Sequence, residues 1–319
     1  MAGTIFCFHG IRGPEQPDGG GIHVREPYLR QAIGLAQRLG TVVPLRDLIA
    51  RCRDGKSTSG LVALTFDDAC LSVLRVAAPI IRDTGTHATV FGVREASESG
   101  TPFWWDRLSQ LAPLFSPAEW ASLLASLDMP PSLPQETDPG RLARDTVIVR
   151  HRGALPPRAL ALLEESETRH GATGQYDRAM TTAELSTLAS DAHFELGVHT
   201  TTHRVLPLLS DEEIESEVRE CHNWLRDVTP QVLPVLAIPY GLRDDRTAPL
   251  AKRAGMEAVL RIAPRNVGRW DESGLPRFSM SERRSGWKLG AALLGAYEWV
   301  YATGLRTGTG DPSMPKLSR

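Results

Sequence analysis

Short apolar segments alternate with amphipathic segments along most of the chain, and this alternation is typical of β/α units that build a parallel sheet. Six segments are predicted to be strands: Thr4 to Phe8, Leu61 to Phe66, His87 to Gly92, His193 to Val198, Leu233 to Ile238 and Glu257 to Arg261. Four are predicted to be helices: Arg25 to Leu39, Leu71 to Thr84, Asp211 to Asp227 and Thr247 to Ala254. A capping box at Ser210 to Glu213 marks the beginning of the third helix. We therefore expect an α/β protein.

Residues 94–190 break this alternation. They contain the sequence Trp104-Trp105-Asp106, a proline-rich stretch from Met129 to Pro134 and several helical segments. We interpret them as a helical insertion in a single domain of residues 1–285, because insertions at the loop face of a barrel commonly shape the substrate cleft. A solvated helical decoration is the alternative.

The C-terminal part of the chain contains another unusual stretch. Residues 287–305 are mostly apolar over 19 residues, but Lys288, Glu298 and several glycines interrupt them. We predict a C-terminal helix over residues 286–305 that packs on the domain. A membrane-surface or partner contact and a membrane span are the alternatives. Residues 306–319 are predicted to form a disordered tail.

Composition and charge argue against several classes of protein. The formal charge is −2 and the charged residues are interspersed, so we expect no nucleic-acid surface. The four cysteines form no Cys-x-x-Cys pair, which argues against a disulfide framework and against a zinc knuckle. The first residues lack the pattern of a signal peptide. We therefore predict a cytoplasmic protein, in solution or at the inner face of the membrane.

Two groups of polar residues directly follow predicted strands. Asp67 and Asp68 come after the strand that ends at Phe66, and His199 and His203 begin where another strand ends. The carboxyl ends of parallel strands lie at the edge of a sheet where catalytic groups collect. Either group alone also fits a helix cap or a surface position. Together, a carboxylate pair and a histidine pair indicate a metal site.

Two imidazoles and one carboxylate form a facial ligand set with open positions, which suits zinc and also cobalt, nickel or iron. We predict that Asp68, His199 and His203 bind this divalent cation. Such a cation lowers the pKa of a bound water toward about 7 and polarises a carbonyl group. Asp67, which does not bind the cation, is the predicted general base for amide hydrolysis.

A third group, Pro239-Tyr240-Gly241, closes another predicted strand. Pro239 presets φ in a turn from which the backbone N–H of Tyr240 would point at a developing oxyanion. Pro-Tyr-Gly is a common turn sequence, so this prediction depends on the two groups that precede it.

In this order, the three groups resemble the motifs of the polysaccharide deacetylase (NodB homology) family of carbohydrate esterases: Thr65-Phe66-Asp67-Asp68, His199-Thr200-Thr201-Thr202-His203 and Pro239-Tyr240-Gly241. The resemblance extends from Thr4 to Met280. It implies a distorted (β/α) barrel, a divalent metal and N-deacetylation of amino sugars. Phe8-His9-Gly10, Ser210 to Leu225 and Trp104 to Arg107 are similar to the branch found in lipopolysaccharide and exopolysaccharide assembly.

The sequence departs from the family pattern in several respects, and two of them concern catalytic residues. The arginine that often precedes the third motif is missing, and we predict that Arg277 replaces it by pairing with Asp67; a surface position is the alternative. The family's usual C-terminal acid histidine is also missing, since no histidine follows His222. His9 is the predicted general acid because it ends the first strand. If His9 is structural instead, Asp67 must return the proton itself.

The predicted function is a metal-dependent hydrolase that removes an N-acetyl or other small N-acyl group from an amino sugar in a glycan, glycolipid or sugar-containing metabolite. One alternative is an O-acetyl esterase or a cyclic-amide hydrolase on the same scaffold. Another is a non-catalytic glycan-binding relative. The expected partner is the carbohydrate substrate, and the sequence leaves the oligomeric state open.

Overall fold

The structure is a computed structural model that describes residues 2–13, 22–129, 138–172, 177–282 and 286–294. Seven parallel strands close into a barrel, in the spatial order β1 (Thr4–Phe8), β10 (Leu275–Ser279), β9 (Ala258–Ile262), β8 (Val232–Ala237), β7 (Phe194–Val198), β6 (Ala88–Gly92) and β5 (Leu61–Phe66). The first strand, β1, closes the ring because it pairs with both β10 and β5. The predicted barrel is confirmed.

Three short strands lie outside this ring. β4 (Thr41–Val42) pairs with the beginning of β5, and β2 (Ile11–Arg12) pairs with β3 (Val24–Arg25) directly after β1. Strand β2 begins directly after His9 and Gly10, and its pairing with β3 holds the chain in place where it leaves the barrel.

Strand residues alternate between the inside of the barrel and the surrounding helices, as the period of two requires. The interior holds a small apolar cluster that includes Ile5, Phe91 and Leu260, and helix α2 (Leu45–Arg53) contributes Leu45 and Leu48 to it. The outward faces of the strands form the largest cluster together with the outer helices.

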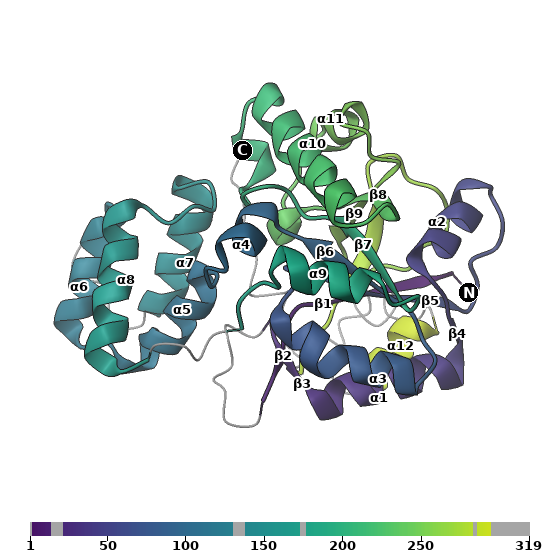
Figure 1. Ribbon diagram of the computed structural model, residues 1–319, viewed down its shortest axis with the longest axis horizontal. Coiled ribbons are helices and arrows are strands. Elements are labelled where there is room, and N and C mark those ends of the chain that lie inside the picture. The colour runs from purple at the N-terminus through teal and green to yellow at the C-terminus, as the bar shows by residue number, and fades with distance from the viewer. Residues whose placement is uncertain (1, 14–21, 130–137, 173–176, 283–285, 295–319) are drawn as a thin grey trace.

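The outer helices cover the barrel as α/β packing predicts (Figure 1). They are α1 (Glu26–Leu39), α3 (Ala78–Asp83), α9 (Thr182–Ala189), α10 (Asp211–Val228), α11 (Thr247–Arg253) and α12 (Gly286–Leu293). The predicted capping box is present at the beginning of α10, where the Ser210 side chain accepts a hydrogen bond from the Glu213 backbone N–H.

The segment between β6 and β7 is helical, as expected from the sequence. It begins with α4 (Arg94–Ser99), and then α5 (Trp104–Leu111), α6 (Pro117–Ser126), α7 (Pro139–Arg150) and α8 (Pro157–His170) lie together at one side of the barrel (Figure 1). These four helices share an apolar cluster of their own, which also includes Val205. The boundaries of the predicted domain stay a prediction.

Two elements differ from the sequence-based expectation. The predicted helix Leu71 to Thr84 is divided into the π-helical turn η2 (Val73–Ala77) and α3, and Pro79, which has no backbone N–H, stands at the beginning of α3 where the two meet. Strand β10 was not predicted, because Pro276 and Arg277 interrupt its apolar pattern. Both residues lie in a strand that is nevertheless buried.

The C-terminal helix is described only at its beginning. α12 ends at Leu293 and packs on α1, with Leu289 and Leu293 in the main core. The rest of the predicted helix, together with the predicted tail, lies outside the described residues. Among the described residues, no helix combines the length and apolar character that crossing a membrane requires.

Candidate metal centre and catalytic site

The three predicted motifs meet at the carboxyl end of the barrel, in short connections with unusual backbone geometry. Four of the seven described non-glycine residues with positive φ lie in these motifs, and a fifth directly follows the first motif: Asp68 (66°), Thr200 (70°), His203 (56°), Tyr240 (57°) and Ala69 (48°). Backbone strain of this kind concentrates at active sites and ligand-binding sites.

Asp68, His199 and His203 converge on one point. The Oδ1 atom of Asp68 lies 3.4 Å from Nε2 of His199 and 3.3 Å from Nε2 of His203. A tetrahedral site with ligands at about 2.1 Å places its ligand atoms about 3.4 Å apart. Asp68 Oδ1 is buried and has no hydrogen-bond partner among the described residues. These three residues therefore have the spacing and the free atom that a divalent cation requires.

The electrostatics of this group also suit a cation. Burial raises the pKa of Asp68, but the two imidazoles outweigh it and hold this pKa well below its usual range. The carboxylate is therefore anionic. The Nδ1 atom of His199 lies 2.7 Å from the Ala237 carbonyl oxygen, which can only accept, so Nδ1 carries a proton; in the neutral form of the ring, the Nε2 lone pair then faces Asp68.

Glu217, on α10, holds the loop between the two histidines. Its carboxylate accepts hydrogen bonds from the backbone N–H groups of Thr201 and Thr202, at 3.0 and 2.9 Å, and from the Thr202 hydroxyl. The Thr200 hydroxyl accepts a further bond from the His203 N–H at 3.0 Å. Analysis of the sequence missed Glu217, because an acidic residue in the middle of an amphipathic helix gives no signal of an inward role.

Asp67 does not point at the site formed by Asp68, His199 and His203. Its carboxylate is paired with Arg277 instead. The guanidinium donates two parallel hydrogen bonds to the carboxylate, both 2.7 Å long, and a 3.2 Å bond to the Thr65 hydroxyl. Arg277 is 0% exposed, so the surface alternative is wrong. Its guanidinium carbon lies 5.5 Å from the centre of the Phe91 ring, and Gly197 is required there because a Cβ would lie 2.4 Å from that ring.

This pair defines the charge of the predicted base. Burial raises the pKa of Asp67, but the charges of Arg277 and His199 outweigh it and lower this pKa to about 2. Asp67 is therefore a carboxylate with a fixed orientation.

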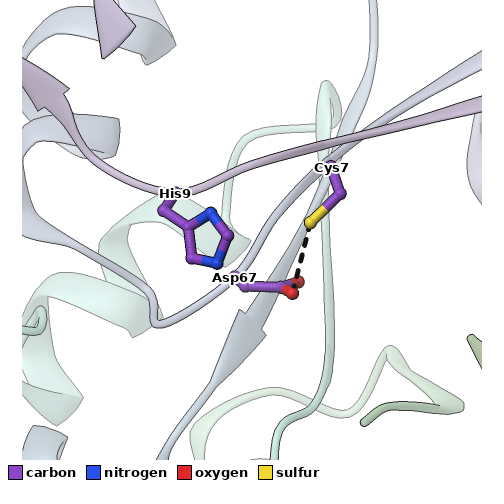
Figure 2. A group of neighbouring side chains, drawn as sticks. All are labelled: Cys7, His9 and Asp67. Atoms are coloured by element: carbon purple, nitrogen blue, oxygen red, sulfur yellow. Dashed lines mark hydrogen bonds between the residues drawn. The ribbon is translucent and has the colours of Figure 1, made fainter. Parts of the chain in front are cut away.

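Two more side chains lie next to Asp67 (Figure 2). Cys7 belongs to β1, and His9 directly follows this strand. The Cys7 thiol donates a 3.3 Å hydrogen bond to Asp67 Oδ2, and one nitrogen of His9 lies within 4.8 Å of the carboxylate. The Nδ1 atom of His9 is buried without a hydrogen-bond partner in the described part of the chain. The structure thus brings His9 to the predicted base, and it adds Cys7, a buried strand residue that no sequence motif singles out.

Tyr240 packs against His203, on the side of the Asp68, His199 and His203 group away from Asp67. Its ring is 4.6 Å from that of His203 and 6.0 Å from that of Trp105, and Trp105 in turn lies 4.8 Å from His203. The Tyr240 hydroxyl donates a 3.2 Å hydrogen bond to the Gly153 carbonyl oxygen, between α7 and α8. The helical insertion therefore forms one wall of the site, which a solvated decoration would not do.

Two further groups of potential ligands are less suited to a cation. Both oxygens of Asp67 in the group Cys7, His9 and Asp67 already accept from Arg277. In the group His23, Cys70 and Asp177, both ring nitrogens of His23 are engaged in hydrogen bonds.

Comparison with known proteins supports the same family. A sequence model described as "Polysaccharide deacetylase" matches residues 155–259, which include the second and third motifs. No curated protein sequence matches the chain.

Solved deacetylase structures share the fold. The deacetylase PplD of Streptococcus pyogenes, in complex with acetate, is 14% identical with a TM-score of 0.56, and the match covers 92% of this chain and 98% of that one. IcaB from Ammonifex degensii is 13% identical with a TM-score of 0.57, covering 92% and 97%. The BpsB deacetylase domain from Bordetella bronchiseptica is 15% identical with a TM-score of 0.50, covering 86% and 94%.

The chain thus has the barrel fold of these deacetylases, and its residues 155–259 match the polysaccharide deacetylase model. More particularly, the chain has the NodB-homology fold, and the resemblance seen in its sequence is confirmed.

Proposed function

We propose that the protein is a metal-dependent hydrolase that removes an N-acetyl or other small N-acyl group from an amino sugar. The observation that carries this proposal is the convergence of Asp68, His199 and His203 on one point, beside a carboxylate that Arg277 holds in a fixed orientation. We assign Asp68, His199 and His203 as the ligands of a divalent cation. Zinc is the preferred metal for two imidazoles and one carboxylate.

The residues of the chain divide the proton transfers between them. A cation held by the three ligands would lower the pKa of a water molecule and polarise the acyl carbonyl. Asp67 accepts the proton of the attacking water as a new C–O bond forms. Three hydrogen bonds, from Arg277 and Cys7, use three of about four lone-pair positions of this carboxylate, so one position is left for the proton.

The second half of the reaction breaks the C–N bond. His9 lies beside Asp67 and donates a proton to the leaving amine, and Asp67 passes the proton that it took from water to His9, so both side chains return to their starting state. The second proton of the water leaves the new carboxyl group and is taken up by the released amine. The backbone N–H of Tyr240 stabilises the oxyanion of the tetrahedral intermediate. The products are the free amino sugar and the carboxylate of the acyl group, so all protons are accounted for.

The test is an acetate-release assay over short N-acetylated amino sugars, with zinc, cobalt or nickel added to the purified protein. Asp67→Asn removes the base, and we expect the rate to fall by about 10²–10⁴-fold. Asp191→Asn, at a partly exposed ion pair with Arg82, serves as the matched control and keeps the wild-type rate.

Several outcomes contradict the proposal. Equal rates for Asp67→Asn and the wild type would remove the assigned base. Release of acetate only from O-acetylated sugars would identify an esterase instead. Saturable binding of glycans without turnover, under every metal tested, would identify a binding protein. The compartment and a contact of residues 287–305 with a membrane stay predictions.

A further inference from the structure

The beginning of α5 contains four consecutive buried residues, each with a partner in a different part of the molecule. Trp104 Nε1 donates to the Gly153 carbonyl oxygen at 2.9 Å, and Trp105 packs on His203. Arg107 forms a two-point ion pair with Glu167 on α8. The remaining residue, Asp106, reaches back to the barrel and is only 4% exposed.

Asp106 is connected to the end of β1 through His23. The Oδ1 atom of Asp106 lies 2.7 Å from Nε2 of His23, and Nδ1 of His23 lies 2.9 Å from the backbone nitrogen of Gly10. A backbone N–H can only donate, so Nδ1 accepts and Nε2 carries the proton that it donates to Asp106. The result is a buried chain of hydrogen bonds from the insertion to the residue after His9.

The turn at Gly10 has no space to shift. A Cβ at Gly10 would lie 2.3 Å from His23 Nδ1 and 2.4 Å from Asp177 Oδ2, so only glycine fits between these side chains. Asp177 is itself held by the side chain and the backbone N–H of Ser72, and the Ser72 hydroxyl accepts from the Ile11 N–H at 2.7 Å.

His9 depends on this turn for its direction. Its Nδ1 is buried without a hydrogen-bond partner in the described ranges, so no hydrogen bond at that nitrogen orients the ring. The Gly10 N–H donates a hydrogen bond to His23 Nδ1, and this bond holds the His9–Gly10 peptide in place. We propose that His23 and Asp106 are a positioning pair that aims His9 at Asp67 and at the leaving amine.

This proposal rests on the proposed function, since it needs His9 to act as the acid. His23 is not the acid itself, because both of its ring nitrogens are already engaged. The proposal also gives the insertion a role in catalysis. Helix α5, which lies outside the β/α repeat, then sets the geometry of His9, the residue after the first strand.

The test compares Asp106→Ala in two backgrounds, the wild type and His9→Ala. A displacement of about 1 Å at a catalytic group costs about 10²-fold, so we expect Asp106→Ala to lower kcat by about 10–100-fold with little change in KM. In the His9→Ala background, the same substitution should change kcat by less than about twofold, because the group that it positions is absent. His23→Ala removes the other member of the pair, the one that contacts Gly10. It should behave in the same way.

Two controls separate positioning from loss of structure. Asp106→Asn keeps an oxygen that can accept from His23 Nε2 and should retain most of kcat. Glu167→Gln weakens the neighbouring ion pair inside the insertion and should leave kcat unchanged. If Asp106→Ala lowers kcat by the same factor with and without His9, the positioning role is refuted.

A crystal structure of Asp106→Ala gives a readout that does not need activity. We expect the His9–Gly10 peptide to move or the His9 side chain to adopt more than one rotamer. An unchanged turn with a single His9 rotamer would overturn the proposal even if the protein proves inactive. Inactivity of the wild type under every metal and substrate would instead refute the proposed function.

Discussion

Replacement of Arg277 by methionine tests whether the interior of the barrel holds a genuine ion pair. The guanidinium is fully buried and makes two 2.7 Å hydrogen bonds to Asp67, which is 3% exposed. Arg277→Met removes the cation and keeps most of the volume, so Asp67 is left as a buried charge without its partner. Breaking a buried pair in this way costs about 3–5 kcal/mol of unfolding free energy.

The dependence on pH has a defined sign. The pKa of Asp67 is about 2 in the folded protein against an ordinary value of 3.8, so the pair contributes its stability above about pH 4. This contribution is lost as the pH falls toward 2. Arg277→Met should therefore be most destabilised, relative to the wild type, at neutral pH.

The assay is urea unfolding at pH 7, monitored by tryptophan fluorescence and circular dichroism. Arg246→Met is the matched control, because Arg246 pairs with Asp211 and Asp244 but its side chain is 41% exposed. Exposed pairs contribute about 1 kcal/mol or less. The double variant Arg277→Met with Asp67→Asn should recover part of the loss, since it removes both charges. If Arg277→Met unfolds within about 1 kcal/mol of the wild type, the argument from burial is refuted.

Three further changes test two residues of the site and one ion pair outside it. His203→Ala should abolish stoichiometric zinc binding in elemental analysis, whereas His193→Ala, at the beginning of β7, should keep it; equal zinc contents would contradict the ligand assignment. Glu217→Ala should weaken zinc binding by about 10–100-fold in a chelator competition, because it frees the loop between the histidines. Hydrogen bonds from Arg178 hold the pKa of Glu184 at about 2, against 4.5, so Glu184 stabilises the fold above about pH 4.5 and loses this contribution toward pH 2. Glu184→Gln should flatten that acid loss by about 1–2 kcal/mol, and an unchanged acid profile would contradict it.

The strands, and the meeting of Asp68 with His199 and His203, could be predicted because their signals are local. Each of the six predicted strands is present, with boundaries that shift by at most one residue, since an apolar run next to polar residues marks both its extent and its end. The parallel arrangement brings the segments of Asp68, His199 and His203 to the same edge of the barrel, while the bonds of Glu217 hold the loop between the histidines.

The residues that support the site could not be found in this way, because their partners are distant in sequence. Asp106 and His23 are 83 positions apart, and Thr202 and Glu217 belong to different elements. The pairing of Arg277 with Asp67 was predicted from the family resemblance, but strand β10, which carries Arg277, was not, since Pro276 and Arg277 themselves hide its pattern. A strand that carries an inward-facing charge does not look like a strand in sequence.

Because β1 is bound on one side by β5 and on the other by β10, the ring is completed by strands from opposite ends of the described chain. A nascent polypeptide therefore cannot finish the barrel until residue 279 has left the ribosome, and the strands made earlier wait with an unpaired edge. Removal of the first ten residues would open the ring at the same seam and would take away Cys7 and His9 together.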